Sequence, residues 1–535
     1  MSRLDKISIT FILGIWLAVL SVGLVSRIPM IGDEVTHYYM LVTQAERLPT
    51  PCFEAQIPLA MDGADKDTKY YTHVALWHYL GAILFRLTGS IAVVQIYHSL
   101  FLLQLLFAVL AIAGRIGCGI EEGRLLAILA VASLPMTLIF SVAFYQDVPA
   151  VAQVLTAFWL LMSGRWLLAA CFISVALGIK ENMILFLPAY FIALITSVCK
   201  NTMWRRVMAI VTTLAILLAS CSYASYVLTK YGHGHYYPYQ VLKIKVSNIL
   251  MKLPEVSERL SADAVPANPT KPAPRVPATL YSPKVICNHP GDLRIKKNWF
   301  IYGGGVLWLC LAFGLAGLFV RKKELEASKV DAWQSFLLLL AGGACIVLTR
   351  LLLEAQEARF LMPGVIFILV PAAVYAARIP KVRLWVWVVI IMAVVQSGAV
   401  LYKTFTLRHV SAGIMEAIDY LKREPPTPNR IFMYPEGNYR FFPCNHTWYL
   451  DYELRKFWKA DNNQRLDMLH AKEIGAIVIK KHLVGVIDPK MENLGVYPDF
   501  FVRDMDTDAR FKKVLDNRHV TIYRVPAIDR STGVK

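Results

Sequence analysis

A series of apolar segments, each about as long as a bilayer-spanning helix, limits the fold of this sequence more than any other feature. A helix needs about 20 apolar residues to cross the hydrocarbon core of a membrane. Hydropathy predicts about eleven spans, at residues 7–26, 91–113, 125–144, 148–162, 166–178, 183–198, 207–228, 299–320, 332–352, 360–376 and 384–401. We therefore expect an α-helical polytopic membrane protein, with the spans in residues 1–401 and a separate α/β domain in residues 402–535.

The basic residues set the predicted orientation of these spans. The net charge is +18, but much of it lies in short loops between apolar segments rather than in one patch, so we expect no nucleic-acid partner. With the N-terminus in the cytosol, every predicted cytosolic loop carries Lys or Arg, as the positive-inside rule requires. The long segments 27–90 and 229–298 and the tail 402–535 then lie on the outer face. No cleavage motif is evident after residues 7–26, so we expect this first span to be retained.

Acidic and basic residues gather together on the predicted outer face. The densest group follows the first span, where Asp33 and Glu34 precede His37 by one helical turn or less. The other members at the outer ends of spans are Asp147, Lys180, Arg350, Glu354, Glu357 and Arg359. Ionisable residues are costly at membrane depth unless they are paired or used. This mixed-sign cluster from separate segments therefore predicts a functional site.

The outer segments also suggest local structure. Residues 74–87 are moderately apolar and predict an interfacial helix, with Trp77, His78 and Tyr79 as interfacial anchors. The tail has the mixed pattern of a soluble α/β domain. Its expected helices are 412–422 and 463–472, and its expected strands are 430–434, 474–480 and 520–524. An odd number of spans places this domain outside the cytosol.

Histidines and cysteines in the outer segments have several interpretations. The residues that could in principle bind zinc are His233, His235, Cys287 and His289. Their spacing is unspecific, so loop histidines without a metal are the favoured interpretation. The cysteines on the outer face are Cys52, Cys287 and Cys444, which allow one disulfide. The sequon at Asn445 has meaning in a glycosylating lumen.

The order of these motifs resembles that of the GT-C glycosyltransferases, multispanning enzymes that take a sugar from a polyprenyl- or dolichyl-phosphate carrier. The closest resemblance is to the bacterial group akin to protein O-mannosyltransferases and lipid A aminoarabinose transferases. Members carry an acidic residue after the first span, here Asp33-Glu34, and a second acidic site at the start of the fourth, here Asp147. A Lys-led turn before a Leu-Pro run matches at Lys180.

Two further motifs extend the resemblance across the membrane region. An Arg-aromatic-Leu-x-Pro element is present as Arg359-Phe360-Leu361-Met362-Pro363. The family's His-Pro-Pro-Leu element reads His73-Val74-Ala75-Leu76 here, without the two prolines. The tail resembles the family's outer-face domains in placement and α/β character.

The resemblance implies a transfer in which a carrier phosphate leaves and a carboxylate takes a proton from the acceptor. Asp33 is the leading candidate for the base, Asp147 competes with it, and Glu34 is a third catalytic carboxylate. The residues expected to bind phosphate or substrate are His73, Lys180, Arg350, Arg359, His37, Glu354 and Glu357. The expected partners are a polyprenyl-phosphate-linked sugar, membrane lipid, and a glycan, lipid or protein acceptor. No cofactor is expected, and a divalent metal is left open because acidic pairs suit either role.

Each candidate also has a structural interpretation. Asp33 and Asp147 could each cap a helix, and Lys180 could pair with Glu181 in an ordinary turn. His73 could be an interfacial side chain, and the charges in 350–359 could form a structural network.

Other functions also fit the charge pattern. A transporter or flippase for lipid-linked sugars is one alternative, and an oligosaccharide ligase or polymerase that uses a diphosphate-linked donor is another. The expected location is the bacterial inner membrane with the site facing the periplasm or the cell exterior, or the ER membrane with a lumenal site in a eukaryote.

Overall fold

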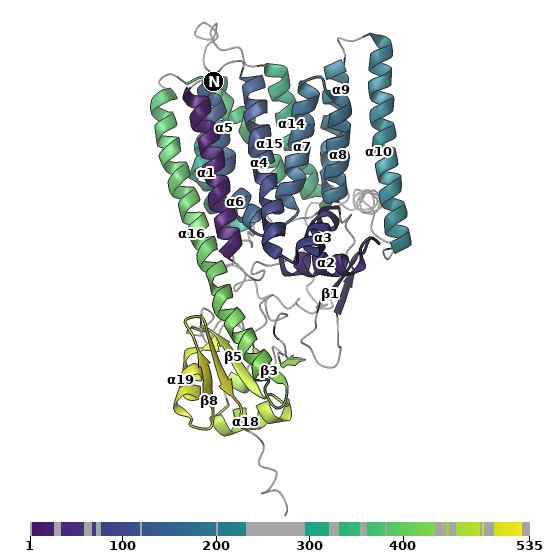
Figure 1. Cartoon of the computed structure of the whole chain (residues 1–535). Helices are drawn as coiled ribbons and strands as arrows, with labels where there is room; N and C mark the ends of the chain where they lie inside the picture. Colours follow the sequence, from purple (N-terminus) through teal and green to yellow (C-terminus); the bar gives the residue numbers. More distant parts are fainter. Residues whose placement is uncertain are drawn as a thin grey trace, which may run out of the picture.

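The computed structural model describes residues 3–25, 34–57, 67–70, 76–117, 120–198, 202–231, 295–319, 331–353, 361–379, 382–433, 442, 446–448, 456–458, 460–481, 484–485 and 497–526. Most of these residues form a bundle of apolar helices, and a small α/β unit lies at one end of it (Figure 1). The N-terminus lies on the side of the bundle opposite this unit. The protein is therefore an integral, multi-pass helical membrane protein.

Five of the described helices are long and apolar enough to cross a membrane. They are α1 (Arg3–Val25), α4 (Ile91–Ile116), α10 (Met203–Tyr231), α14 (Ala332–Leu353) and α16 (Val382–Arg423). Helices α5 (Glu121–Ala132) and α6 (Pro135–Val142) meet at a bend of 58°. If this bent pair counts as one span, it is the sixth. Pro135 lacks the N–H needed to continue α5, so it starts a new helix.

The remaining apolar helices are shorter or broken. Four short ones are α7 (Asp147–Met162), α8 (Trp166–Ile179), α9 (Leu187–Val198) and α15 (Met362–Ala376), and the 3₁₀ helix η1 (Glu181–Phe186) precedes α9. Helix α13 (Ile295–Leu318) is kinked at Gly304, so its unbroken apolar part is Gly304–Leu318. These helices occupy other ranges expected to span, but their unbroken lengths do not meet the length criterion. The count of about eleven spans stays a prediction.

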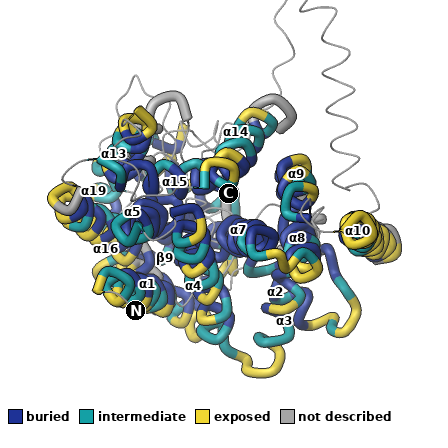
Figure 2. The backbone as a smooth tube through the Cα atoms, turned by 90° about the horizontal axis from the view of Figure 1, so that it is seen from above, coloured by how far each residue is buried: buried dark blue, intermediate teal, exposed yellow. Residues whose placement is uncertain are grey.

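Helices α5, α7 and α15 form the centre of the bundle. Figure 2 shows their backbones as buried, whereas α10 stands at the edge, where it packs on α8 and α9. Nearly every residue of α7 is buried, so its first residue, Asp147, begins inside the protein.

Two helices and a hairpin lie on the side of the bundle that carries the α/β unit (Figure 1). These elements are α2 (Glu34–Arg47), α3 (Leu76–Thr88), and strands β1 (Glu54–Ile57) and β2 (Asp67–Tyr70). Helix α3 forms where the sequence predicts a non-spanning helix. Its anchors differ from the prediction: Trp77 and His78 are fully buried within the protein rather than exposed at an interface.

The α/β unit contains a five-stranded mixed sheet with the order β4-β3-β5-β9-β8. Its strands are β3 (Arg430–Met433), β4 (His446–Trp448), β5 (Ala476–Lys480), β8 (Lys512–Asp516) and β9 (Val520–Arg524). A two-stranded parallel pair joins β6 (Val484–Gly485) to β7 (Tyr497–Pro498). The expected strands at 430–434, 474–480 and 520–524 are confirmed, whereas β8 and the helix α19 (Asp499–Thr507) are additional.

Alternating residues on the strands pack on opposite faces of this sheet, as the period of a β-strand requires. One face carries Phe432, Ile477 and Tyr523 and packs on α18 (Asn462–Ala471) and α19. The other face packs on the end of α16. The helix expected at 412–422 is thus not separate from the last span but continues it, so α16 has 42 residues, roughly 60 Å at 1.5 Å per residue.

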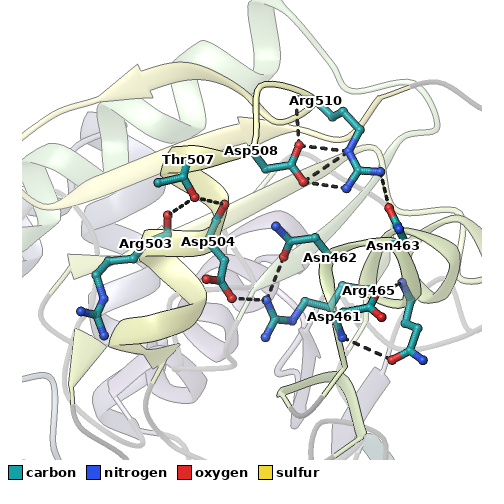
Figure 3. Close-up of polar contacts among 10 residues, drawn as sticks. Asp461, Asn462, Asn463, Arg465, Arg503, Asp504, Thr507, Asp508 and Arg510 are labelled. Carbon is teal, nitrogen blue, oxygen red and sulfur yellow. Dashed lines mark hydrogen bonds and ion pairs between the residues drawn. The ribbon is translucent and has the colours of Figure 1, made fainter.

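Polar contacts hold α18 and α19 together (Figure 3). Asp461 and Gln464 form a capping box at the start of α18, which satisfies two helix N–H groups. Arg465 is buried, and its Nη1 donates to Asp504 of α19 over 2.6 Å. The contacts of Arg465 run to Asn462, to Asp504 and to the backbone carbonyls of Phe457 and Trp458, so we assign this group a structural role.

Candidate active site

The first part of the site is the start of α2, where a carboxylate is fully buried. Glu34 is the first residue of α2 and is 0% exposed. Its Oε1 accepts a hydrogen bond from the backbone N–H of Phe144 over 3.1 Å. The same oxygen forms an ion pair with Arg408. A carboxylate held by a guanidinium and a backbone donor is well suited to fix a segment in place, and less suited to accept a proton.

Arg408 is a residue that sequence reasoning missed. It lies on α16 and is 1% exposed, with Nη2 donating to the Val142 carbonyl over 3.0 Å and Nη1 to the Gly23 carbonyl over 3.4 Å. A signal was present in the sequence, because this arginine lies just past the predicted outer end of the last span, where the positive-inside rule does not call for a basic residue.

A chain of hydrogen bonds leads from α2 to the start of α7. His37 Nδ1 and His78 Nε2 are 2.9 Å apart, with their rings stacked at 5.1 Å. His78 Nδ1 lies 3.1 Å from Gln146 Nε2, whose amide N–H can donate to it. His37 was expected at the site, whereas His78 and Gln146 were not. Because all three side chains are buried, this chain forms part of the protein interior and not of a lipid-facing belt.

The second ion pair joins Asp147 to Lys180. Lys180 Nζ lies 2.5 Å from Asp147 Oδ1, and the two side chains are 11% and 2% exposed. Lys180 occupies the break between α8 and η1, and Asp147 begins α7. The cap position of α7 is Gln146, so the interpretation of Asp147 as an N-cap is wrong. The structure thus brings together Glu34, His37, Asp147 and Lys180, four residues predicted from three separate segments.

The remaining predicted residues are not placed by the structure. Those outside the described residues are Asp33, His73, Glu354, Glu357 and Arg359. Arg350 belongs to α14, and nothing is described of its side chain. The potential zinc ligands His233, His235, Cys287 and His289, the cysteine Cys444 and the sequon residue Asn445 also lie outside.

No group of three or more metal-binding side chains occurs among the described residues. The site as described is built from two ion pairs joined by an imidazole–amide chain.

Comparison with known proteins gives one family match. Residues 70–237 match the family model described as ALG3 protein, a range that includes His78, Asp147 and Lys180. A search of curated proteins gives no match.

Several solved structures are similar in overall shape. The crystal structure of the oligosaccharyltransferase from Archaeoglobus fulgidus is 10% identical, with 88% of this chain and 70% of that chain covered and a TM-score of 0.44. The arabinofuranosyltransferase AftD from Mycobacteria is 14% identical, with 99% and 40% covered and a TM-score of 0.45. ArnT from Cupriavidus metallidurans in the apo state is 12% identical, with 97% of each chain covered and a TM-score of 0.48. Similarity at this level carries no information on substrates or catalytic residues.

The family match overlaps the sequence motifs that resemble those of GT-C glycosyltransferases. The motifs at His73, Asp147 and Lys180 lie inside the matched range. The family match covers less than a third of the chain, so it describes this segment and names no substrate.

Proposed function

We propose that the protein transfers a sugar from a polyprenyl- or dolichyl-phosphate carrier to an acceptor on the extracytoplasmic face of the membrane. The observation that carries this proposal is the buried Asp147–Lys180 pair at one end of the His37–His78–Gln146 chain. A cation and a carboxylate lie together here, next to the chain that starts on α2 and α3. These two helices lie at the side of the bundle that carries the α/β unit (Figure 1). We place this side in the periplasm of a bacterium or in the ER lumen of a eukaryote.

Lys180 supplies the positive charge that such a reaction needs. As the carrier phosphate leaves the anomeric carbon, negative charge grows on its bridging oxygen, and a fixed cation stabilises that charge. An ammonium group exchanges readily between oxygen ligands because its donors rotate. Lys180 can therefore turn from Asp147 towards the phosphate, assisted by Arg359, His73 and Arg350. Glu354 and Glu357 are proposed to bind sugar hydroxyls.

We assign the base from the partners of Glu34 and Asp147 and from the position of Asp33 in the sequence. Glu34 is already held by Arg408 and by the Phe144 N–H, so we assign it a positioning role. Asp33, directly before it, is the proposed general base, which takes the acceptor proton as the acceptor oxygen attacks the anomeric carbon. Asp147 is the second candidate, because release of Lys180 to the phosphate leaves its carboxylate able to accept a proton.

The experiment is a transfer assay on the purified full chain with undecaprenyl-phosphate-linked and undecaprenyl-diphosphate-linked sugars. We expect transfer from the monophosphate carrier alone. We also expect Asp33→Asn to lower turnover by about 10² or more, since a general base contributes that much, and Glu34→Gln to lower it less. Transfer from the diphosphate carrier, or translocation without transfer, would support one of the alternative functions. Near-normal turnover in Asp33→Asn together with none in Asp147→Asn would assign the base to Asp147.

A further inference from the structure

Helix α16 connects the membrane bundle to the α/β unit without a break. Its apolar part ends at Thr406, and the helix runs on to Arg423. Arg408 lies in the second position after the apolar part, where the helix leaves the bundle. A continuous helix is stiff along its axis, because each residue is tied to the next turn by a backbone hydrogen bond. Any force on the α/β unit is therefore transmitted to the position of Arg408.

Arg408 joins three other elements at this point. The Gly23 carbonyl lies near the C-terminal end of α1, and the Val142 carbonyl belongs to the last residue of α6. Carbonyls at helix C-termini lack intrahelical partners and carry partial negative charge. The third partner, Glu34, begins α2. A planar guanidinium with five N–H donors can serve all three acceptors at once, whereas a lysine ammonium presents a single point charge.

The far end of α16 is fixed to the sheet. Four of its buried residues pack on one face of the sheet, namely Ile414, Ala417, Ile418 and Leu421. Asn517, in the turn between β8 and β9, donates from Nδ2 to the Gly413 carbonyl over 3.1 Å and to Glu416 over 2.9 Å. Gly413 allows this turn to approach closely, because a Cβ there would lie 2.8 Å from the Cβ of His519. The helix and the sheet therefore form one packed unit.

We propose that Arg408 is a positioning residue through which the α/β unit fixes the acidic start of α2 for transfer. This inference rests on the proposed function and adds to it a role for the C-terminal unit. The α/β unit holds α16, α16 carries Arg408, and Arg408 holds Glu34, the neighbour of the proposed base. Because a misplacement of about 1 Å can cost about 10² in rate, loss of this contact should act on turnover more than on donor binding.

The test uses Arg408→Leu, Arg408→Lys, Glu34→Gln and the double variant Glu34→Gln/Arg408→Leu. Arg423→Leu is the matched control, an exposed arginine on the same helix. We expect Arg408→Leu to lower kcat by about 10², with KM for the undecaprenyl-phosphate donor changed by about threefold or less. Arg408→Lys should recover part of kcat. The double variant should be no slower than Arg408→Leu, because both changes remove the same contact.

A second readout does not depend on catalysis. Hydrogen exchange of the full chain in nanodiscs should be faster in residues 34–47 for Arg408→Leu and Arg408→Lys, and unchanged for Arg423→Leu. Wild-type kcat together with unchanged exchange in Arg408→Lys and Glu34→Gln would overturn the inference, even if Arg408→Leu failed to fold. A third outcome is faster exchange in the Arg408 variants although the wild-type protein transfers no sugar. This outcome would preserve the positioning role of Arg408 and refute the proposed function.

Discussion

The buried Asp147–Lys180 pair offers a test that separates a functional ion pair from a structural one. Three variants are needed: Asp147→Asn, Lys180→Met and the double variant. Each replacement has nearly the volume of the original side chain and removes its charge. A pair that serves structure alone can be replaced as a unit, whereas a pair that serves catalysis cannot.

The structure sets the size of the expected effects. The charges are 2.5 Å apart and almost fully buried. With an effective dielectric constant of about 20, their attraction is about 7 kcal/mol, much of which offsets their desolvation. Removing one partner leaves the other charge unpaired and should cost about 3–5 kcal/mol in the free energy of unfolding. Removing both leaves no charge to desolvate, so the double variant should be within about 1 kcal/mol of wild type.

The assay combines thermal unfolding in detergent with transfer from the monophosphate carrier. Both single variants should unfold at lower temperature and lose activity. The double variant should recover the unfolding temperature but stay about 10² or more below wild type in turnover. The matched control is the Asp5–Arg124 pair, which is 2.9 Å apart but 18% and 23% exposed. Neutralising this pair should change neither the unfolding temperature nor the turnover by much. Wild-type turnover in the Asp147/Lys180 double variant would refute the catalytic role of the pair.

Three further predictions concern the donor, the orientation and the α/β unit. Arg359→Ala or His73→Ala should weaken donor binding by about 1.5–3 kcal/mol, because each removes a charge-assisted contact of that value. The measurement is the KM for the carrier. An unchanged KM in both variants would mean that other residues bind the phosphate. A phosphatase fused after residue 535 should be active, and a fluorescent reporter that works only in the cytosol should be dark when fused at the same place. The reverse result would mean that the predicted orientation is wrong. Hydrogen bonds from Arg510 hold the pKa of Asp508 below its usual range, so the folded state binds fewer protons than the unfolded one. This contribution to stability is present above the pKa of the unfolded chain and is lost as pH falls through the folded pKa. Thermal unfolding of the α/β unit in the full chain should therefore depend less on acidic pH in Arg510→Gln, and an unchanged pH profile would contradict the assignment.

Much of the fold could be predicted because it depends on properties that are local in the sequence. The length of an apolar run decides whether a helix can span a bilayer, and alternation of apolar residues indicates a half-buried strand. Strands β3, β5 and β9 and helix α18 lie where these patterns place them. The bend between α5 and α6 was not expected, although Pro135 is a local signal for it. Strand β8 was missed because its residues are mostly exposed and show no clear alternation.

Some residues of the candidate site could be selected from the sequence, because the signal that marks them is also local. A charge at the end of an apolar segment stands out in any sequence, so Glu34, His37, Asp147 and Lys180 could be selected as candidates. Their partners could not be chosen, because pairing depends on distances between residues far apart in the chain. Lys180 forms an ion pair with Asp147, 33 positions away, and Glu34 forms one with Arg408, 374 positions away.

The sequence by itself determined that this chain enters a membrane, which residues carry charge there, and which segments fold as helices or strands. The tertiary structure alone decided which charges neutralise one another. It moved Trp77 and His78 from an expected interface into the interior, and it fused the last span to the helix that supports the sheet. The physical reason is that burial and ion pairing depend on the packing of whole helices, in which elements separated by hundreds of residues bring their side chains within hydrogen-bond distance.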